Sequence, residues 1–315
     1  IYSYNLLYSH MLHLFHELIY STANRGVKSE ALISQQYRLD YFELAEQIQK
    51  LAAGLIKIGI ARGERLAVYL EKRVEGVTAL FATSAAGGVF VPINPLLKAE
   101  QVGYILNDCN VRILVTSASR FNLLKSVLTN CHDLHTVIVV DEDLELPSVK
   151  GLNIIRWREV ITEKTSYYMH RTIDSDMAAI LYTSGSTGKP KGVVLSHRNL
   201  VTGAKSVSTY LKNNSDDRVL SVLPLSFDYG LSQLTTAFYV GATCVLMNYL
   251  LPRDIMDEVI KEDITGLAAV PPLWIQLSQL KWDGLTSLRY ITNSGGAMPK
   301  ATLDQLRSHF PKTSI

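Results

Sequence analysis

The chain alternates short, continuous apolar runs with longer stretches in which apolar residues recur every three or four positions. The first pattern is typical of buried strands, and the second is typical of amphipathic helices that bury one face. Two helices are expected before the first strand, over residues 5–22 and 41–59, and the second of them ends at the stop signal Gly59. Both helices are expected to pack on a lobe through their apolar faces.

Strands and helices then alternate in two successive sets. The first set has expected strands at 66–70, 89–93, 111–115 and 136–140, with helices at 74–87, 98–109 and 120–130. The second set has expected strands at 218–223, 243–247, 266–270 and 288–292, with helices at 196–211, 231–240, 253–262, 273–280 and 299–310. Strands separated by helices favour parallel sheets covered by helices on both faces. The pattern therefore predicts an α/β fold with two stacked, doubly wound, mostly parallel sheets, one in a lobe of residues 1–172 and one in a lobe of residues 173–315.

Composition excludes several classes of protein. With 315 residues, 47% hydrophobic and 19% charged, the chain is long enough for two lobes that each bury a core. The net charge is only +2 and the basic residues are scattered, so nothing indicates a nucleic-acid partner. No run approaches the roughly 18–20 apolar residues of a membrane span. Cys109, Cys131 and Cys244 lie far apart without a C-x-x-C pair, which favours a reducing, cytoplasmic location.

Two groups of potential metal ligands are weak candidates. His10, His13 and His16 follow one another at intervals of three, so they rotate around a helix, and a solvated polar face explains them better than a metal site. The acidic run 141–147 ends at a proline and is expected to be a solvated loop, because its residues have no fixed frame. We expect no metal site built from these residues.

The stretch 182–192, YTSGSTGKPKG, concentrates polar chemistry as no other segment does. It lies between 177–182 and 193–195, which both read as buried strands, so it is expected to be a hairpin-like crossing between strands. Glycines let the backbone approach a ligand, hydroxyls donate hydrogen bonds, and lysines neutralise charge. This combination predicts binding of a nucleotide polyphosphate.

Two familiar phosphate loops and one bland alternative fit this stretch poorly. A Walker loop needs four residues between its first glycine and the Gly-Lys pair, whereas Gly185 and Gly188 have two between them. A dinucleotide fingerprint opens a helix, whereas this loop opens a strand. A flexible Ser/Thr/Gly linker would not normally lie between two buried strands.

Residues 183–192 resemble the signature of the adenylate-forming superfamily, which comprises acyl-CoA synthetases, luciferases and the adenylation domains of peptide synthetases. Segments 44–67, 88–95, 224–230 and 293–299 resemble further landmarks of that superfamily. The phrases 225–238 and 288–299 resemble in particular the AMP-forming acyl-CoA ligases associated with bacterial exosortase systems. The resemblance implies an acyl-CoA synthetase-like N-terminal domain.

The resemblance also implies an activity. Such an AMP-forming acid–thiol ligase uses ATP and Mg²⁺ to activate a small-molecule carboxylate as an acyl-adenylate, releases pyrophosphate, and transfers the acyl group to coenzyme A. The alternative is amino-acid adenylation, with loading of the phosphopantetheine of an acyl carrier protein. A second alternative is a non-catalytic nucleotide-binding fragment.

Individual roles follow from the resemblance as well. The residues that would bind the β- and γ-phosphates or keep the backbone open there are Thr183, Ser184, Gly185, Ser186, Thr187 and Gly188. Lys191 matches the family lysine and joins Thr183 as a candidate catalytic residue, whereas Lys189 occupies a variable place. Gly295, Gly296 and Ala297 match the stretch along the adenine, which borders the acyl pocket next to Ser294.

Phe227 and Asp228 match the positions that inform on the substrate. In acyl-CoA ligases the first position often holds a gating aromatic residue or His, and in amino-acid adenylation domains the second holds an Asp that binds the α-ammonium group. The hypothesis is therefore an amino acid or another polar carboxylate as substrate. Asp is also a favoured N-cap, so Asp228 is equally explained as the cap of a helix that begins near Tyr229.

The superfamily carries further elements that residues 1–315 do not contain. They are a Tyr-Gly-x-Thr-Glu motif whose Glu binds Mg²⁺, an Asp for the ribose, a hinge, and a small C-terminal domain with a lysine. The chain also begins without Met. We therefore expect a fragment that lacks the end of the N-terminal domain and the C-terminal domain, and that forms adenylate poorly by itself.

Overall fold

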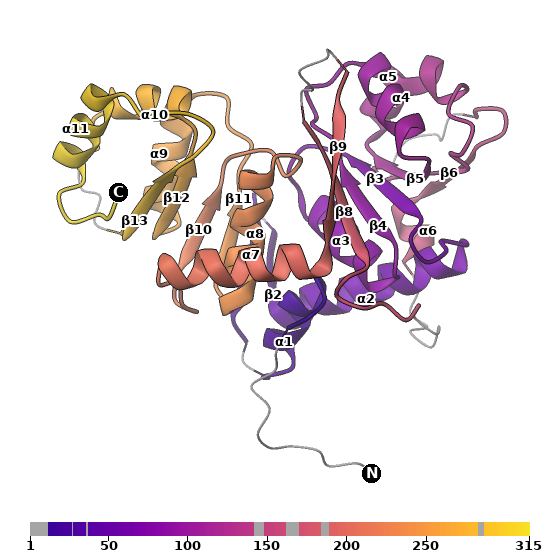
Figure 1. The fold of residues 1–315 in the computed structure, drawn as a ribbon, viewed down its shortest axis with the longest axis horizontal. Coiled ribbons are helices and arrows are strands. Elements are labelled where there is room, and N and C mark those ends of the chain that lie inside the picture. Colours follow the sequence, from indigo (N-terminus) through magenta and orange to yellow (C-terminus); the bar gives the residue numbers. More distant parts are fainter. Residues whose placement is uncertain are drawn as a thin grey trace, which may run out of the picture.

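Two sheets lie side by side in the computed structural model, which describes residues 12–26, 28–35, 37–141, 148–161, 170–183, 189–282 and 287–315 (Figure 1). The seven-stranded sheet has the order β7 (Asn153–Arg156), β6 (Thr136–Val139), β5 (Val111–Thr116), β3 (Arg65–Tyr69), β4 (Val89–Pro92), β8 (Met177–Thr183) and β9 (Lys191–Ser196). The six-stranded sheet has the order β13 (Tyr290–Asn293), β12 (Gly266–Ala269), β10 (Arg218–Ser221), β11 (Thr243–Leu246), β1 (Glu30–Ser34) and β2 (Tyr37–Asp40). All neighbours pair in parallel except β8 with β9 and β1 with β2. The expected α/β class with two mostly parallel sheets is confirmed.

Helices cover the outer faces of both sheets and fill the space between them. On the outer face of the seven-stranded sheet pack α4 (Ala99–Asp108) and α5 (Ala118–Leu128). On the outer face of the six-stranded sheet pack α9 (Pro252–Lys261), α10 (Pro271–Ser278) and α11 (Lys300–His309). The remaining helices contribute to the core that both sheets share, and they are α1 (Glu17–Ala23), α2 (Tyr41–Lys57), α3 (Val74–Ala85), α6 (Trp157–Val160), α7 (His197–Tyr210) and α8 (Asp228–Val240).

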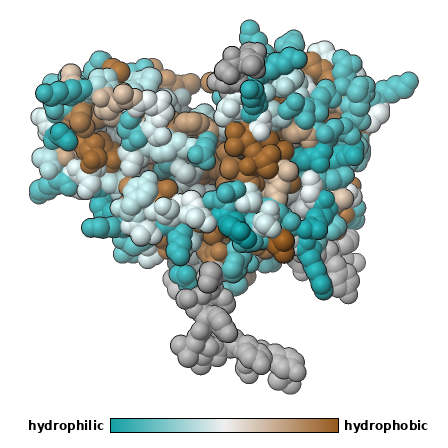
Figure 2. Space-filling view, in the orientation of Figure 1, coloured by the Kyte–Doolittle hydropathy of each residue, from teal (hydrophilic) through white to brown (hydrophobic). Residues whose placement is uncertain are grey.

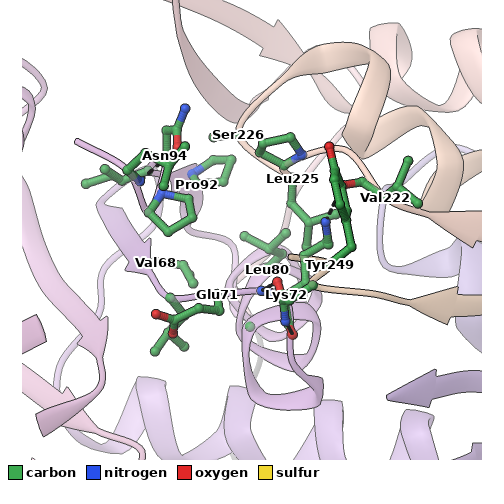
Figure 3. Close-up of a pocket in the computed structure, with 17 residues that line it drawn as sticks. Val68, Glu71, Lys72, Leu80, Pro92, Asn94, Val222, Leu225, Ser226 and Tyr249 are labelled. Carbon is green, nitrogen blue, oxygen red and sulfur yellow. Dashed lines mark hydrogen bonds between the residues drawn. The ribbon is translucent and has the colours of Figure 1, made fainter. Parts of the chain in front are cut away.

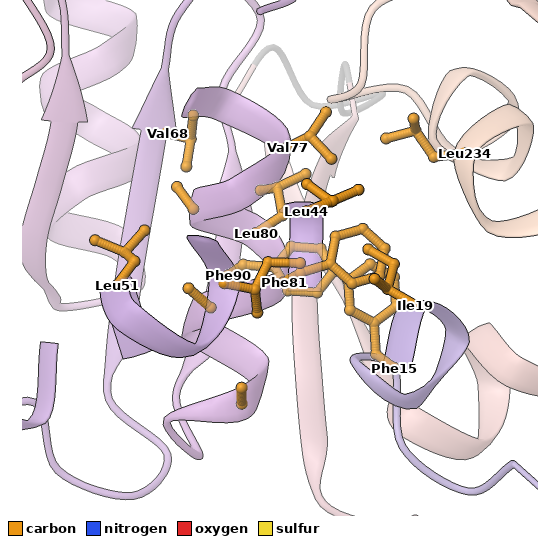
Figure 4. Packing of buried hydrophobic residues seen from close by; sticks show 14 of the residues in the cluster. Phe15, Ile19, Leu44, Leu51, Val68, Val77, Leu80, Phe81, Phe90 and Leu234 are labelled. Atoms are coloured by element: carbon orange, nitrogen blue, oxygen red, sulfur yellow. The ribbon is translucent and has the colours of Figure 1, made fainter. Parts of the chain in front are cut away.

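The shared core is built around stacked aromatic rings (Figure 4). Phe81 of α3 stacks on Phe15 with 4.1 Å between ring centroids, and it meets Phe238 of α8 edge-on at 5.6 Å. The Tyr41 hydroxyl at the start of α2 donates to the carbonyl of Ala242, which leads into β11, at 2.7 Å. These contacts join elements of both sheets into one interior.

The division expected after residue 172 does not match the division between sheets. β8 and β9 follow that boundary in the sequence. In the structure β8 pairs with β4, so both strands belong to the seven-stranded sheet. β1 and β2 precede the boundary, yet β1 pairs with β11 in the six-stranded sheet. Sheet membership depends on which distant strands pair with each other. The local pattern along the chain carries no information on that pairing or its register.

The structure differs from two further expectations and contains elements that the sequence does not predict. The strand after the polar loop is not buried, because β9 is an edge strand whose first four residues are exposed. The helix expected over 5–22 begins only at Glu17, and Leu14 and Phe15 precede it. Residues 1–11, among them His10, lie outside the described residues. The hairpin β1–β2 and the strand β7 were not among the expected elements.

The cysteines, the potential metal ligands and the lengths of the helices can be compared with the sequence-based expectations. All three cysteines are buried thiols without a disulfide. Among the described residues, no group of three or more His, Cys, Asp and Glu side chains could hold a metal ion. No helix in the described ranges has both the length and the apolar content needed to cross a bilayer. Most of the acidic run, 142–147, lies outside the described residues.

Candidate functional site

The polar loop joins β8 to β9 as a hairpin, as the sequence predicts. The two strands are antiparallel up to the pair Thr183 and Lys191, and both of these side chains are exposed. Ser184, Gly185, Ser186, Thr187 and Gly188 lie outside the described residues, so their phosphate-binding roles stay predictions. The structure therefore places the two ends of the loop at the end of β8, which lies next to the edge of the sheet, and at the start of the edge strand β9.

Tyr182 anchors the base of this hairpin to the end of helix α4. Its hydroxyl donates to Asp108 Oδ2 at 2.6 Å, and burial together with this hydrogen bond raises the pKa of the hydroxyl. A Cβ on Gly192 would lie 2.7 Å from a methyl group of Ile180 and 3.2 Å from the Tyr182 ring. The close approach of β9 to β8 at this point therefore requires glycine.

A first cavity of about 670 Å³ opens beside the hairpin. Its lining includes Thr183 at the end of β8, Leu223 just after β10, and Val270 just after β12. The carboxyl ends of parallel strands from both sheets thus meet at one cavity, which is where open α/β sheets bind ligands. In Figure 2 a hydrophobic patch lies near the middle of the visible face, in the region of β9, whose Val193 and Val194 are exposed. Val193 and Leu195 of β9 also line the first cavity.

Phe227 and Asp228 line the first cavity at the N-terminus of α8. Phe227 occupies the N-cap position and no side chain caps the helix, so the interpretation of Asp228 as the cap is wrong. Asp228 is instead the first residue of the helix, where a negative charge interacts favourably with the helix dipole. Its carboxylate is exposed and has no hydrogen bond to the described residues, which leaves it available to a ligand.

Gly230 explains why the start of α8 lies so close to the strand end that precedes it. A Cβ there would lie 2.1 Å from the carbonyl oxygen of Pro224, closer than any real contact. The Phe227 amide donates to the same carbonyl at 3.1 Å. Since the helix packs directly on the Pro224 backbone, Phe227 and Asp228 are held at the edge of the cavity.

The segment Ser294–Ala297 follows β13 and is exposed. Gly295 has φ of +80°, and a Cβ there would lie 3.4 Å from Val270 and 3.8 Å from the tip of Phe227. The Asn293 side chain donates to the carbonyl of Gly296 at 2.9 Å and closes this turn. The structure therefore places Gly295 next to Phe227 and Val270, which line the cavity, but Ser294, Gly295, Gly296 and Ala297 are not themselves among the lining residues.

Most residues that line the first cavity are not site residues that the sequence predicts, and three of them have a position in common. Asn94, Ser226 and Val270 line the first cavity, and each lies a few residues beyond the carboxyl end of a parallel strand. That position was the available signal, because such residues gather at one edge of a sheet. The hydroxyls of Thr183 and Ser226 and the amide of Asn94 supply polar groups, and leucine and valine side chains supply most of the remaining wall.

A second cavity of about 320 Å³ adjoins the first and shares Asn94, Pro224 and Ser226 with it (Figure 3). Lys72, which follows β3, lines it and spans the gap between the two sheets. Its ammonium group donates to the carbonyls of Val222 at 2.6 Å and Leu223 at 3.3 Å. Burial lowers the pKa of Lys72 to about 8. No sequence pattern distinguished this lysine.

Comparison with known proteins adds independent evidence. The model of the family described as "AMP-binding enzyme" matches residues 19–315. The chain is 30% identical to 4-coumarate--CoA ligase 3 of Arabidopsis thaliana over 85% of this chain and 48% of that protein. It is 28% identical to bacitracin synthase 3 of Bacillus licheniformis over 94% of this chain and 4% of that protein. A solved structure of VinN with L-aspartate superposes with a TM-score of 0.81 at 25% identity, over 95% of this chain and 74% of that chain.

The chain therefore spans about half of the plant ligase and a small part of the bacitracin synthase. One of these relatives is named as a CoA ligase, the other as a synthase of bacitracin. The two matches cover 85% and 94% of this chain, and the family model covers residues 19–315, which contain both sheets and the residues that line the first cavity.

Proposed function

Because the chain belongs to the AMP-binding enzyme family, we propose that it is the ATP- and carboxylate-binding part of an adenylate-forming ligase. A carboxylate oxygen attacks the α-phosphorus of ATP, the bond to pyrophosphate breaks, and an acyl-adenylate forms. The acyl carbon then passes to the sulfur of coenzyme A, and AMP leaves. In this proposal Mg²⁺ enters with ATP, and the described residues offer no cluster that would hold it alone.

One observation carries the proposal: the phosphate hairpin and the candidate substrate residues line a single cavity. Thr183 at the hairpin lines it together with Phe227 and Asp228, although the hairpin belongs to the seven-stranded sheet and α8 connects two strands of the six-stranded sheet. Positioning of two reactants in one site lowers the activation barrier of such a transfer, and hydrogen-bond donors directed at the phosphate oxygens lower it further. Lys191, paired opposite Thr183, has the charge and position to neutralise the phosphates.

Exchange of labelled pyrophosphate into ATP, measured on the enzyme that carries this chain, tests the proposal. We expect exchange that depends on a carboxylate, and we expect Lys191→Ala to lower kcat/KM for ATP about 100-fold. Lys205→Ala, an exposed lysine on α7, is the matched control and should leave exchange unchanged. Absence of carboxylate-dependent exchange in the wild-type enzyme would favour a non-catalytic nucleotide-binding protein.

The position of Asp228 favours an amino acid or another polar carboxylate as substrate. Its carboxylate faces the first cavity without a partner among the described residues, and an α-ammonium group would form a charge-assisted hydrogen bond with it. The likeness to VinN, solved with L-aspartate, points in the same direction. We expect Asp228→Asn to reduce exchange with amino acids, while the exposed Asp304→Asn on α11 leaves it unchanged. Exchange with fatty acids alone would contradict this assignment.

The thiol acceptor is proposed to be coenzyme A, with a carrier-protein phosphopantetheine as the alternative. The relatives include enzymes named for each kind of chemistry, such as 4-coumarate--CoA ligase 3 and L-proline--[L-prolyl-carrier protein] ligase of Pseudomonas fluorescens. Single-turnover transfer from preformed acyl-adenylate to coenzyme A, compared with transfer to a phosphopantetheinylated carrier protein, decides between them. Faster transfer to the carrier protein would overturn the assignment to coenzyme A.

A further inference from the structure

The ammonium group of Lys72 lies in the second cavity with one hydrogen-bonding position left open. An ammonium group has three N–H donors, and the carbonyls of Val222 and Leu223 accept from two of them. No carboxylate among the described residues forms an ion pair with Lys72. The side chain is half-buried, and a charge that has lost part of its hydration without gaining a counter-ion is unfavourable, so this position favours a ligand that supplies a negative charge.

The surroundings of Lys72 leave that positive charge uncompensated. Glu71 also lines the second cavity, but Arg120 binds its carboxylate through two N–H groups. The Asn248 side chain accepts from the Lys72 amide at 3.1 Å and donates to the Lys72 carbonyl at 2.7 Å, which fixes the backbone. Figure 3 shows Lys72 on the side of Val222 and Tyr249, with Pro92 and Asn94 across the cavity. Apart from Glu71 and Lys72, the lining residues carry no charge.

We propose that the second cavity binds the distal carboxylate of a dicarboxylic acid, with Lys72 as its counter-ion, while the other carboxylate reacts in the first cavity. The inference rests on the proposed function and names its substrate class. The two cavities share Asn94, Pro224 and Ser226, so one linear molecule can extend through both. The second cavity, of about 320 Å³, has room for about ten water-sized groups at roughly 30 Å³ each. An anion in this cavity gains an ion pair with Lys72 without displacing an existing partner.

Pyrophosphate exchange with matched pairs of acids tests the proposal on the enzyme that carries this chain. The probes are linear α,ω-dicarboxylates of four to ten carbons, each compared with the monocarboxylate of the same length, with and without an α-amino group. We expect kcat/KM to favour the dicarboxylate at least tenfold at the best length. Lys72→Met, which keeps the apolar stem and removes the charge, is expected to abolish this preference, and Lys72→Arg is expected to retain part of it. Lys205→Met serves as the control and should leave the preference unchanged.

Direct binding separates this inference from the proposed function. Calorimetry on the 315-residue chain without ATP should give tighter binding of the dicarboxylate than of the monocarboxylate, and this difference should vanish in Lys72→Met. Exchange that proceeds equally with both acids would overturn the Lys72 inference and leave adenylation intact. If no acid supports exchange, the proposed adenylation is wrong, and the difference in binding alone decides the role of Lys72.

A second experiment applies if Lys72→Met does not fold. In it, an acylating probe reacts with the Lys72 amine in the wild-type chain. Protection by the dicarboxylate but not by the monocarboxylate supports the inference, and equal reactivity with both contradicts it.

Discussion

Lys72 shows how a single side chain can couple pH to stability. Burial lowers its pKa from 10.5 to about 8, since the charged form loses its hydration. Between these two values the unfolded chain holds a proton that the folded chain has released. The free energy of unfolding therefore rises with pH in this window, and below pH 8 the full cost of the buried charge is present.

The effect of Lys72 on the pH dependence of stability can be isolated by comparing the wild type with the Lys72→Met variant. The free energy of unfolding of the wild type, minus that of Lys72→Met, should increase by about 2 kcal/mol from pH 7 to pH 10. Tyrosine and cysteine residues also titrate in this range, but they are common to both proteins and cancel in the difference. Urea denaturation at several pH values provides the measurement. A difference that stays flat over this range would show that Lys72 keeps an ordinary pKa in the folded state.

The helix α8 depends on one glycine for its position. Gly230→Ala would place a Cβ against the Pro224 carbonyl, where 2.1 Å is available, so the helix must move away from the strand end. We expect a loss of about 2 kcal/mol in the free energy of unfolding, as for other overpacked sites. Carboxylate-dependent exchange should fall as well, because Phe227 and Asp228 move with the helix.

Gly203→Ala on α7 is the matched control for this change. It has no heavy atom within 4 Å of its Cβ position, so the same substitution there should stabilise the protein by about 0.5–1 kcal/mol through helix propensity. Urea denaturation of the two variants measures both effects. Equal and small effects at both positions would mean that α8 tolerates the extra methyl group.

A network around Asp217 holds the start of β10 to the segments that lead into β12 and β13. Asp217 is 3% exposed and accepts hydrogen bonds from Arg289 at 2.6 Å, Thr265 at 2.7 Å and Asn213 at 3.0 Å. Burial raises the pKa of its carboxyl, but these hydrogen bonds outweigh that effect and lower the pKa overall. A depressed pKa means that the carboxylate stabilises the fold above its unfolded pKa and loses this contribution as pH falls through the folded value.

Asp217→Asn is expected to lower the free energy of unfolding by about 2 kcal/mol at pH 7, since it leaves buried donors without an acceptor. The neighbouring exposed Asp216→Asn should have no measurable effect. Thermal unfolding at pH 7 and at pH 3 provides the comparison. The deficit of Asp217→Asn should shrink at pH 3, because the carboxyl in the unfolded wild-type chain then takes up a proton and the advantage of the folded carboxylate falls. A deficit independent of pH would contradict the role assigned to its charge.

Elements with a strong local signal could be predicted from the sequence, and elements defined by distant partners could not. The capped helix α7 begins at Ser196, as the hydroxyl at that position predicts, and the amphipathic α2 ends close to Gly59. The hairpin β1–β2 escaped prediction because its more buried strand, β1, pairs with β11, some two hundred positions along the chain.

The same reasoning separates the predicted from the unpredicted parts of the site. Phe227 and Asp228 lie in a motif that is contiguous in sequence, and the structure places both on the wall of the first cavity, with Gly295 of another contiguous motif next to Phe227. Lys72 acts through carbonyls on the other sheet, so its environment exists only after folding. Residues whose chemistry depends on long-range packing leave no local pattern.

At the scale of the whole molecule, the two sheets share one interior. The rings of Phe15, Phe81 and Phe238 pack against one another between them, and the Tyr41 hydroxyl donates to the Ala242 carbonyl. Both candidate cavities are formed by residues of the two sheets together. A site of this kind requires that the sheets keep a fixed relation, which a large apolar contact provides.

The shared core predicts that both sheets unfold as one cooperative unit. Leu124 of α5 is fully buried in the outer core of the seven-stranded sheet, far from the six-stranded one. Leu124→Ala should lower the free energy of unfolding by about 3 kcal/mol. In a cooperative unit, hydrogen exchange of the amides in β12 should lose the same protection as that of the amides in β5. The adjacent Leu123, 65% exposed, gives the control Leu123→Ala, which should change neither. If β12 keeps its protection while β5 loses it, the sheets unfold separately, and the cavities between them would be lost whenever one of the two sheets unfolds.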